Sequence, residues 1–313
     1  MKHRFFQTLT MVAIFSFAIL FTACEDDDTP DPTPKNLVEI AQEQGFAQLA
    51  AALTEAGLVD VIATTDNLTV FAPTDAAFDK FLSDNNFADF TAVPDALLEN
   101  TLKYHVLGQK VLSSAITDGY VGTLDASGPA GTTIDLLITT EGGVKLNGDI
   151  PVKTPDVEAS NGVIHVIETV LNRPSVVGIA SNNSSFSTLV DAVVKAELAT
   201  TLSGEGPFTV FAPTNAAFDS LFKALNVDGI ADLTKEQLTP ILLNHVLDGN
   251  IREDAVVDLI TGGTTSVTTK NETAISLKIM DGKVMINDNT TVTATNVQGV
   301  NGVVHVIDKV LVP

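Results

Sequence analysis

The stretch Thr69–Phe78 reads TVFAPTDAAF, and the stretch Thr209–Phe218 reads TVFAPTNAAF. Asn161–Ile167 reads NGVIHVI and returns as NGVVHVI at Asn301–Ile307. Both pairs of blocks are separated by the same 140 residues. A spacing kept over blocks this far apart indicates two copies of a whole domain, because solenoid repeats recur every 20 to 50 residues or so.

The length fits two domains of ordinary size. Of the 313 residues, the first 35 read as leader and linker, and the rest divides into residues 36–173 and 174–313, which we call module 1 and module 2. Each module is long enough to bury a core of its own. The only cysteine is Cys24, outside both modules, so no disulfide joins parts of this chain.

The first 23 residues have the pattern of an export signal. Lys2 and Arg4 form a basic start, an apolar run of about 13 residues follows, and small residues precede Cys24. This run is shorter than the roughly 20 residues of a membrane-spanning helix, so residues 1–23 are predicted to be a signal peptide. Phe21-Thr22-Ala23-Cys24 resembles the lipobox of bacterial lipoproteins, in which the cysteine thiol receives a diacylglyceryl group. The alternative is an ordinary signal peptide followed by an incidental cysteine.

Residues 24–35 are predicted to be an extended tether. Acidic Glu25–Asp28 follows the cysteine, and prolines then alternate with small polar residues, so the segment cannot bury apolar surface. An acidic patch after a lipidated cysteine resembles the signal that sends lipoproteins of the Bacteroidetes to the outer face of the outer membrane. We therefore expect an outer-membrane lipoprotein exposed at the cell surface, and the alternative is that these charges only keep a linker soluble.

The net charge of −22 restricts the partners. Phosphate binding needs a basic surface, so nucleic acid is excluded as a partner class. Anionic polysaccharides would be repelled unless a cation bridged them. Contact with a membrane is expected only through the lipid anchor.

Each module begins with helical patterns and ends with strand patterns. Apolar residues follow helical spacing over 46–53 and again over 186–193. The β-branched runs that end at Pro73 and Pro213 predict short strands, since a central strand cannot continue through proline. Later in each module, alternating apolar residues around glycine-containing turns predict hairpins.

The residues after these prolines predict the start of a helix. Thr74 and Thr214 can cap it, and Asp75 lies in its first turn, where the helix dipole favours a carboxylate. The second copy has Asn215 in place of Asp75. The Asn-Gly pairs that open the closing blocks predict tight hairpins of type I′. The fold class is therefore α+β, with a group of helices first and an antiparallel β part after it.

Three ordered blocks in each module resemble the signatures of the fasciclin-like domain family. They are the Phe-Ala-Pro-Thr-(Asp/Asn)-Ala-Ala-Phe block, the (Tyr/Asn)-His block and the closing Asn-Gly-Val-(Ile/Val)-His-Val-Ile block. The resemblance covers roughly residues 36–313, nearly the whole mature chain. It implies a wedge or sandwich of antiparallel strands with helices alongside, and an extracellular role in cell adhesion or matrix interaction.

The same resemblance implies candidate interaction residues. In animal members of the family the Tyr-His block is associated with receptor contact, which here corresponds to Tyr104 and His105. In the second copy the pair is Asn244 and His245, which departs from the family pattern at the first position. We take all four as interaction candidates.

Histidines recur at matched positions: His105 and His165 in module 1, His245 and His305 in module 2. One interpretation makes each pair a metal site or an acid–base couple. The other makes them buried, hydrogen-bonded residues between a helix end and the last strand, because aliphatic residues flank them. We favour the structural interpretation, since zinc would need further ligands and neither cysteine nor a His-x3-His pattern is present.

Catalytic motifs are absent from the sequence. There is no Gly-x-Ser-x-Gly elbow, spare cysteine, phosphate loop or His-Glu-x-x-His. No cofactor is predicted. A weak surface calcium site stays open, because Asn287–Asn289 near Asp281 offers oxygen ligands without the spacing of an EF-hand.

Three functions from different classes remain. The favoured one is a surface-anchored adhesion or interaction protein that binds a protein, matrix or polysaccharide. The second is an accessory carbohydrate-binding lipoprotein; with no tryptophan and two tyrosines, broad aromatic platforms are not expected, which leaves shallow polar recognition. An enzyme is the least favoured.

Overall fold

The structure is a computed structural model that describes residues 34–263 and 265–313. The predicted signal peptide, Cys24 and all but the last two residues of the predicted tether lie outside the described residues. Pro34–Pro313 form one compact unit. Within the described residues, no helix has both the length and the apolar content needed to span a membrane.

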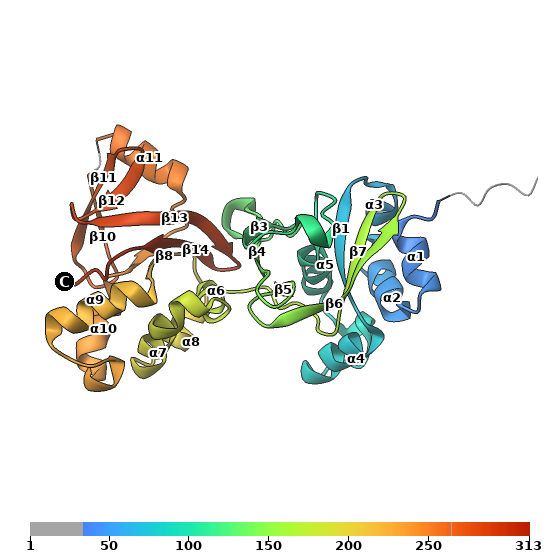
Figure 1. Cartoon of the computed structure of the whole chain (residues 1–313), viewed down its shortest axis with the longest axis horizontal. Helices are drawn as coiled ribbons and strands as arrows, with labels where there is room; N and C mark the ends of the chain where they lie inside the picture. Colours follow the sequence, from blue (N-terminus) through green and yellow to red (C-terminus); the bar gives the residue numbers. More distant parts are fainter. Residues whose placement is uncertain (1–33, 264) are drawn as a thin grey trace, which may run out of the picture. The chain divides into compact units, whose positions relative to one another are not determined.

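Module 1 starts with helices, as its periodicity predicts (Figure 1). The N-cap residue Asn36 makes a capping box with Glu39, and Thr74 caps the helix after the first strand through a bond to the N–H of Ala77. The helices are α1 (Leu37–Glu43), α2 (Ala47–Glu55), α3 (Val59–Thr64), α4 (Asp75–Asp84) and α5 (Asp95–Tyr104), with short 3-10 turns η1 (Phe90–Ala92), η2 (Ser113–Ala115) and η3 (Pro129–Gly131).

A seven-stranded sheet completes module 1, in the order β2-β1-β7-β6-β5-β4-β3. Its strands are β1 (Leu68–Pro73), β2 (Val106–Leu107), β3 (Gly119–Gly122), β4 (Asp135–Thr139), β5 (Lys145–Leu146), β6 (Ile150–Ala159) and β7 (Gly162–Ile167). The α+β class is confirmed, but β1 and β7 pair in parallel, so the sheet is mixed and not wholly antiparallel. This pair can be parallel because a long connection with its own helices and strands separates the two strands.

Module 2 repeats this order of elements. Its helices are α6 (Val176–Ser181), α7 (Ser187–Lys195), α8 (Ala199–Ser203), α9 (Asn215–Leu225), α10 (Lys235–Leu243) and α11 (Glu253–Thr261), with 3-10 turns η4 (Ser184–Phe186) and η5 (Ile230–Asp232). Its strands are β8 (Phe208–Pro213), β9 (Val246–Asp248), β10 (Ser266–Thr268), β11 (Ala274–Met280), β12 (Lys283–Ile286), β13 (Thr290–Gly299) and β14 (Gly302–Ile307). The order β10-β11-β12-β13-β14-β8-β9 matches the first sheet, and β8 again pairs in parallel with β14.

The predicted type I′ turns at the closing Asn-Gly pairs are wrong. Asn161 and Asn301 are not among the residues with positive φ, which a type I′ turn requires. Glycine is needed after them for another reason: a Cβ on Gly162 would lie 2.3 Å from the carbonyl oxygen of Leu68, and one on Gly302 would lie 2.1 Å from that of Phe208. The parallel neighbour strand passes too close for a side chain.

Each module has an apolar core on both sides of its sheet. In module 1 the helices pack around Phe78 and Leu98, and the strands enclose a second cluster around Phe71 and Ile134. Module 2 repeats both clusters. The elements that carry the sequence motifs therefore lie between two apolar layers.

Candidate functional site

The Tyr-His pair of module 1 lies inside the fold. Tyr104 is 0% exposed and His105 is 2% exposed. The Tyr104 hydroxyl bonds to the backbone oxygen of Asp135 at 3.1 Å and to Asn147. The ring of His105 donates from Nδ1 to the Thr101 carbonyl at 2.7 Å and accepts from the N–H of Leu171 at Nε2, at 2.8 Å.

The Asn-His pair of module 2 has the same position. Asn244 is 1% exposed and His245 is 2% exposed. His245 donates from Nδ1 to Ile241 at 2.8 Å and accepts from the N–H of Leu311 at Nε2, also at 2.8 Å. Asn244 donates to the Leu311 carbonyl at 3.1 Å. The interaction candidates are thus corrected: in the folded modules these four side chains tie a helix end to the last segment of the module, and none is open to a partner.

Burial fixes the protonation of both histidines. Removal from water lowers the pKa of His105 to about 4 and that of His245 to about 4, because a charged imidazole is disfavoured there. Each neutral ring has one donor and one acceptor nitrogen, and both are in use. Neither ring has a nitrogen left for a metal or for proton transfer. Among the described residues, no group of three or more His, Cys, Asp or Glu side chains could hold a metal ion.

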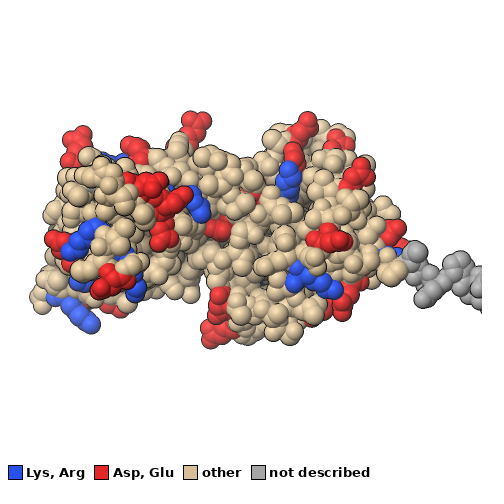
Figure 2. Space-filling model, turned by 90° about the horizontal axis from the view of Figure 1, so that it is seen from above, with Lys and Arg blue, Asp and Glu red and all other residues tan. Residues whose placement is uncertain are grey.

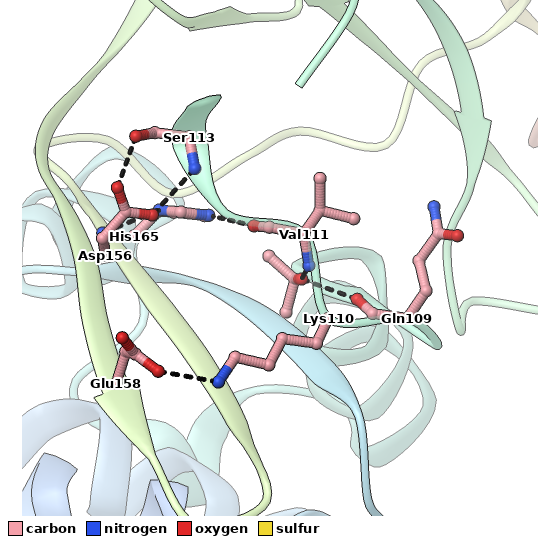
Figure 3. Close-up of polar contacts among 8 residues, drawn as sticks. Gln109, Lys110, Val111, Ser113, Asp156, Glu158 and His165 are labelled. Atoms are coloured by element: carbon pink, nitrogen blue, oxygen red, sulfur yellow. Dashed lines mark hydrogen bonds and ion pairs between the residues drawn. The ribbon is translucent and has the colours of Figure 1, made fainter. Parts of the chain in front are cut away.

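His165 belongs to a separate polar cluster with Ser113 and Asp156 (Figure 3). Asp156 has a φ of 61° at an irregular position of β6, where the pairing register with β7 shifts. Its backbone N–H donates to Nδ1 of His165 at 3.2 Å, and Nε2 of that ring donates to the Val111 carbonyl at 2.9 Å. The Asp156 carboxylate accepts from the N–H of Ser113 at 2.7 Å and from its hydroxyl.

This cluster has the residue types of a hydrolase triad but not its order of contacts. In a triad the histidine takes the serine proton and the carboxylate orients the histidine. Here the Ser113 hydroxyl donates to Asp156, and both nitrogens of His165 are used by backbone groups. The bonds from Ser113 hold the pKa of Asp156 below its usual range, and burial lowers the pKa of His165. Ser113 is therefore not activated as a nucleophile.

Module 2 retains the geometry without the triad chemistry. Asn296, with a φ of 64°, donates its backbone N–H to Nδ1 of His305 at 3.3 Å, and Nε2 of His305 donates to the Ile251 carbonyl at 2.9 Å. The Asn296 side chain accepts from the N–H of Glu253, the first residue of α11, at 2.7 Å. Since one copy has serine and aspartate where the other has glutamate and asparagine, the shared function of the cluster is to anchor a segment to the sheet. These contacts agree with the structural interpretation of the histidines.

The block after each proline has a second contact that sequence reasoning missed. Thr74 and Thr214 cap their helices, as predicted. Asp75 lies in the first turn of α4, but its carboxylate accepts from the N–H of Gln48 in α2 at 2.9 Å. Asn215 accepts in the same way from Thr188 in α7 at 3.0 Å. This bond needs only an acceptor oxygen on the side chain. Aspartate in module 1 and asparagine in module 2 both provide one.

Asn161 and Asn301 are the most connected side chains of the motifs. Asn161 accepts from the N–H of Leu37 at 2.9 Å and donates to the carbonyls of Ile62, Ala63 and Thr65. Asn301 accepts from Val176 at 2.9 Å and donates to the carbonyls of Leu202 and Gly204. They bind the start of the first helix to the end of the third. The sequence signal that could have identified them is the recurrence of asparagine at the start of both closing blocks.

The residues considered for calcium are held by other groups. Asn287 accepts from the N–H of Ser276 at 2.9 Å, and Asp288 forms an ion pair with Lys278 at 2.6 Å. Asn289 accepts from the Thr290 hydroxyl at 3.0 Å. These contacts pull the oxygens toward separate partners and not toward a common centre. Cys24, the predicted lipid attachment residue, lies outside the described residues.

Acidic side chains are distributed over the surface seen in Figure 2, with basic ones scattered among them. Most of the ion pairs join exposed groups, such as Lys80 with Asp84 at 2.8 Å and Lys153 with Glu168 at 3.0 Å. The view shows no continuous basic face that could follow a phosphate backbone.

Known proteins resemble one or both modules. The family model described as "Fasciclin domain" matches residues 44–173 and 184–313. Protein sll1483 of Synechocystis sp. is 41% identical over 139 residues, 44% of this chain and 73% of that protein. The transforming growth factor-beta-induced protein ig-h3 of Sus scrofa is 28% identical over 249 residues, 79% of this chain but only 35% of that protein.

A solved structure has the same fold. It is the FAS1 domain pair from the insect cell adhesion molecule fasciclin I, with a TM-score of 0.50 and 17% identity, covering 87% of this chain and 98% of that one. Duplicated motifs, matching sheet orders and a family model that covers both modules lead to one conclusion. The chain belongs to the fasciclin domain family and carries two copies of its domain.

Proposed function

We propose that this chain is a non-catalytic interaction protein held at the cell surface by a lipid on Cys24, with two fasciclin domains that bind an extracellular partner. The observation that carries the proposal is the use of the repeated polar residues. In both copies the histidines and asparagines of the motifs are occupied by structural hydrogen bonds. The motifs thus supply a rigid scaffold and leave recognition to the surface around them.

The relatives support adhesion as the kind of binding. The structural neighbour is described as a cell adhesion molecule. Partners of the same kind, a protein, a matrix component or a polysaccharide at the cell surface, fit a chain that has no continuous basic face in Figure 2. The acidic segment after Cys24 supports the outer face of the outer membrane, as in lipoproteins of the Bacteroidetes type.

Adhesion is tested with purified protein. Beads coated with the Cys24→Ser chain, which cannot be lipidated, should retain cells or matrix in a saturable way, and beads coated with urea-unfolded protein should not. Equal retention by folded and unfolded protein would contradict a folded recognition surface.

Display is tested by protease treatment of intact cells. Rapid cleavage on intact cells, together with release of the Cys24→Ser variant into the medium, is the expected result. Protection until lysis would place the protein inside the envelope and contradict surface display. A turnover abolished by His165→Ala at unchanged melting temperature would contradict the non-catalytic assignment.

A further inference from the structure

A cavity of about 720 Å³ opens between the β4–β5 hairpin of module 1 and the α6–η4 connection of module 2. Hairpin residues 137–149 form one wall, and Ser181–Ser184 form the other. Ligand sites in proteins typically have volumes of about 300–1,000 Å³, so the cavity, which we call the hairpin groove, is large enough for a small ligand.

The two walls of the hairpin groove are held together by defined contacts. The N–H of Gln298 donates to the Asp135 carboxylate at 2.7 Å, and the Asn183 amide donates to the Tyr120 hydroxyl at 3.0 Å. At Gly148 the backbones approach so closely that a Cβ would lie 2.4 Å from the Asn182 carbonyl oxygen. The groove is therefore a feature of the packed pair of modules.

Two kinds of polar side chain line this groove. Asn147 and Asn183 are fixed by bonds inside the protein, to the Tyr104 hydroxyl and to the N–H of Ser185 among others. By contrast, the side chains of seven lining residues make no hydrogen bond or ion pair with any described residue: Thr139, Glu141, Lys145, Asp149, Ser181, Asn182 and Ser184. Together they present hydroxyl, amide, ammonium and carboxylate groups to the same space.

The chemistry of these groups selects a class of ligand. The lining offers both hydrogen-bond donors and acceptors, and one ammonium against two carboxylates leaves it slightly acidic within a chain of net charge −22. Leu137 is the one large aliphatic residue of the lining, so a peptide would find no apolar anchor. We infer that the hairpin groove binds a neutral polyhydroxylated ligand, a short stretch of uncharged polysaccharide.

This inference deepens the proposed function, because it names a ligand class for the surface interaction. It does not depend on where the protein is displayed. Binding in solution can succeed while adhesion to cells fails, and adhesion can succeed while binding in solution fails. The two proposals are therefore separable by experiment.

The test is a titration of the purified Cys24→Ser chain with neutral oligosaccharides of β-glucan, mannan and xylan, followed by calorimetry and amide NMR. We expect saturable binding to at least one of them, with shifts confined to residues 137–149 and 181–184. The double variant Lys145→Ala/Asn182→Ala should weaken binding at least tenfold, since two of the free polar groups would be lost.

The duplication supplies a matched control. Lys283 lies in the corresponding β11–β12 hairpin of module 2, and Gln44 is the C-cap residue of α1 as Asn182 is of α6. The variant Lys283→Ala/Gln44→Ala changes the same kinds of residue without touching the groove, and it should bind like the parent chain.

Three results would overturn the inference. One is the absence of saturable binding to every neutral oligosaccharide at millimolar concentration. Another is equal affinity of the groove variant and the control variant. The third is a preference for acidic oligosaccharides or for extended peptides over neutral saccharides. Melting temperatures of all variants verify that a loss of binding does not come from unfolding.

Discussion

In each module a single asparagine joins the start of the first helix to the end of the third. Asn161 is 6% exposed and joins the backbone of Leu37 to three carbonyls at the end of α3. No other side chain type offers this acceptor and paired donors in so small a volume. Aspartate at this position would place a carboxylate oxygen, which cannot donate, against the three carbonyl oxygens, and these acceptors would repel one another.

We predict that Asn161→Ala lowers the free energy of unfolding of module 1 by about 2–4 kcal/mol, because several buried backbone groups lose their partner. Tyr104 is buried in module 1, whereas Tyr120 packs against the core of module 2, so the measurement is made in a Tyr120→Phe background, where tyrosine fluorescence in urea reports module 1. Ser160→Ala, at the exposed neighbour, should change the value by less than about 0.5 kcal/mol. Equal effects of the two substitutions would show that the buried bonds contribute nothing.

Acid should destabilise both modules through their buried histidines. The pKa of His105 is about 4 in the folded state against an ordinary 6.5, so protons bind the unfolded chain more readily. The contribution of neutral His105 to the free energy of unfolding is complete above pH 6.5 and is lost as the pH falls toward 4. The loss over this pH range is about 3 kcal/mol.

His105→Asn should be less stable than the parent at pH 7 but should show a shallower decline of module 1 stability between pH 6.5 and 4.5, measured by tyrosine fluorescence in urea. His245→Asn, in the other module, is the control and should leave this tyrosine signal unchanged. A decline as steep in His105→Asn as in the parent would assign the acid sensitivity to other groups.

At the scale of elements, the two copies differ in how well helices fill the space above the sheet. Module 2 has an apolar cavity of about 30 Å³ lined by Val176, Val193 and Val304. The matching positions of module 1 are Leu37, Leu53 and Ile164, all buried and each larger by one methylene group. The sequence difference therefore accounts for the cavity.

Filling this cavity should stabilise module 2. Val176→Leu is predicted to raise its free energy of unfolding by about 0.5–1 kcal/mol, from the cost of a void of this size. The reverse change, Leu37→Val, should lower that of module 1 by about 1 kcal/mol. Urea unfolding checks both: tyrosine fluorescence follows module 1, circular dichroism follows both modules, and a transition seen by circular dichroism alone belongs to module 2. A loss of stability in Val176→Leu would mean that the walls cannot accommodate the added methyl group.

At the scale of the whole molecule, the duplicated blocks and their periodicity predicted the fold class and the order of helices before strands. They did not predict the parallel pairing of β1 with β7, because alternation marks a strand but not its neighbour. The candidate site was predicted less well. Tyr104 and His105 are polar residues that an interaction role requires to be exposed, but they are buried in the structure. Their hydrogen-bond partners at Asp135 and Leu171 are distant in sequence, so the sequence pattern did not reveal them.

The contact between modules is closest at one backbone position, Gly148. Gly148→Ala combines a φ of +90° with a Cβ 2.4 Å from Asn182, so we predict that it separates the modules and enlarges the radius of gyration in small-angle scattering. Gly142→Ala is the control, because Gly142 has a φ of +73° and open space around it. It should carry a similar backbone strain without changing the scattering. Identical scattering curves for both variants would contradict the prediction.

The parallel pairing also governs the timing of folding. β1 opens the sheet of module 1 at Leu68, yet its partner Gly162 comes 94 residues later. A chain emerging from the ribosome cannot join β1 to β7 and the rest of the sheet until nearly the whole module has been made, and contacts this distant in sequence form slowly. Each module consequently stays open through most of its own synthesis, and this unfolded form is the one that the export proposed above would need for passage through a narrow channel.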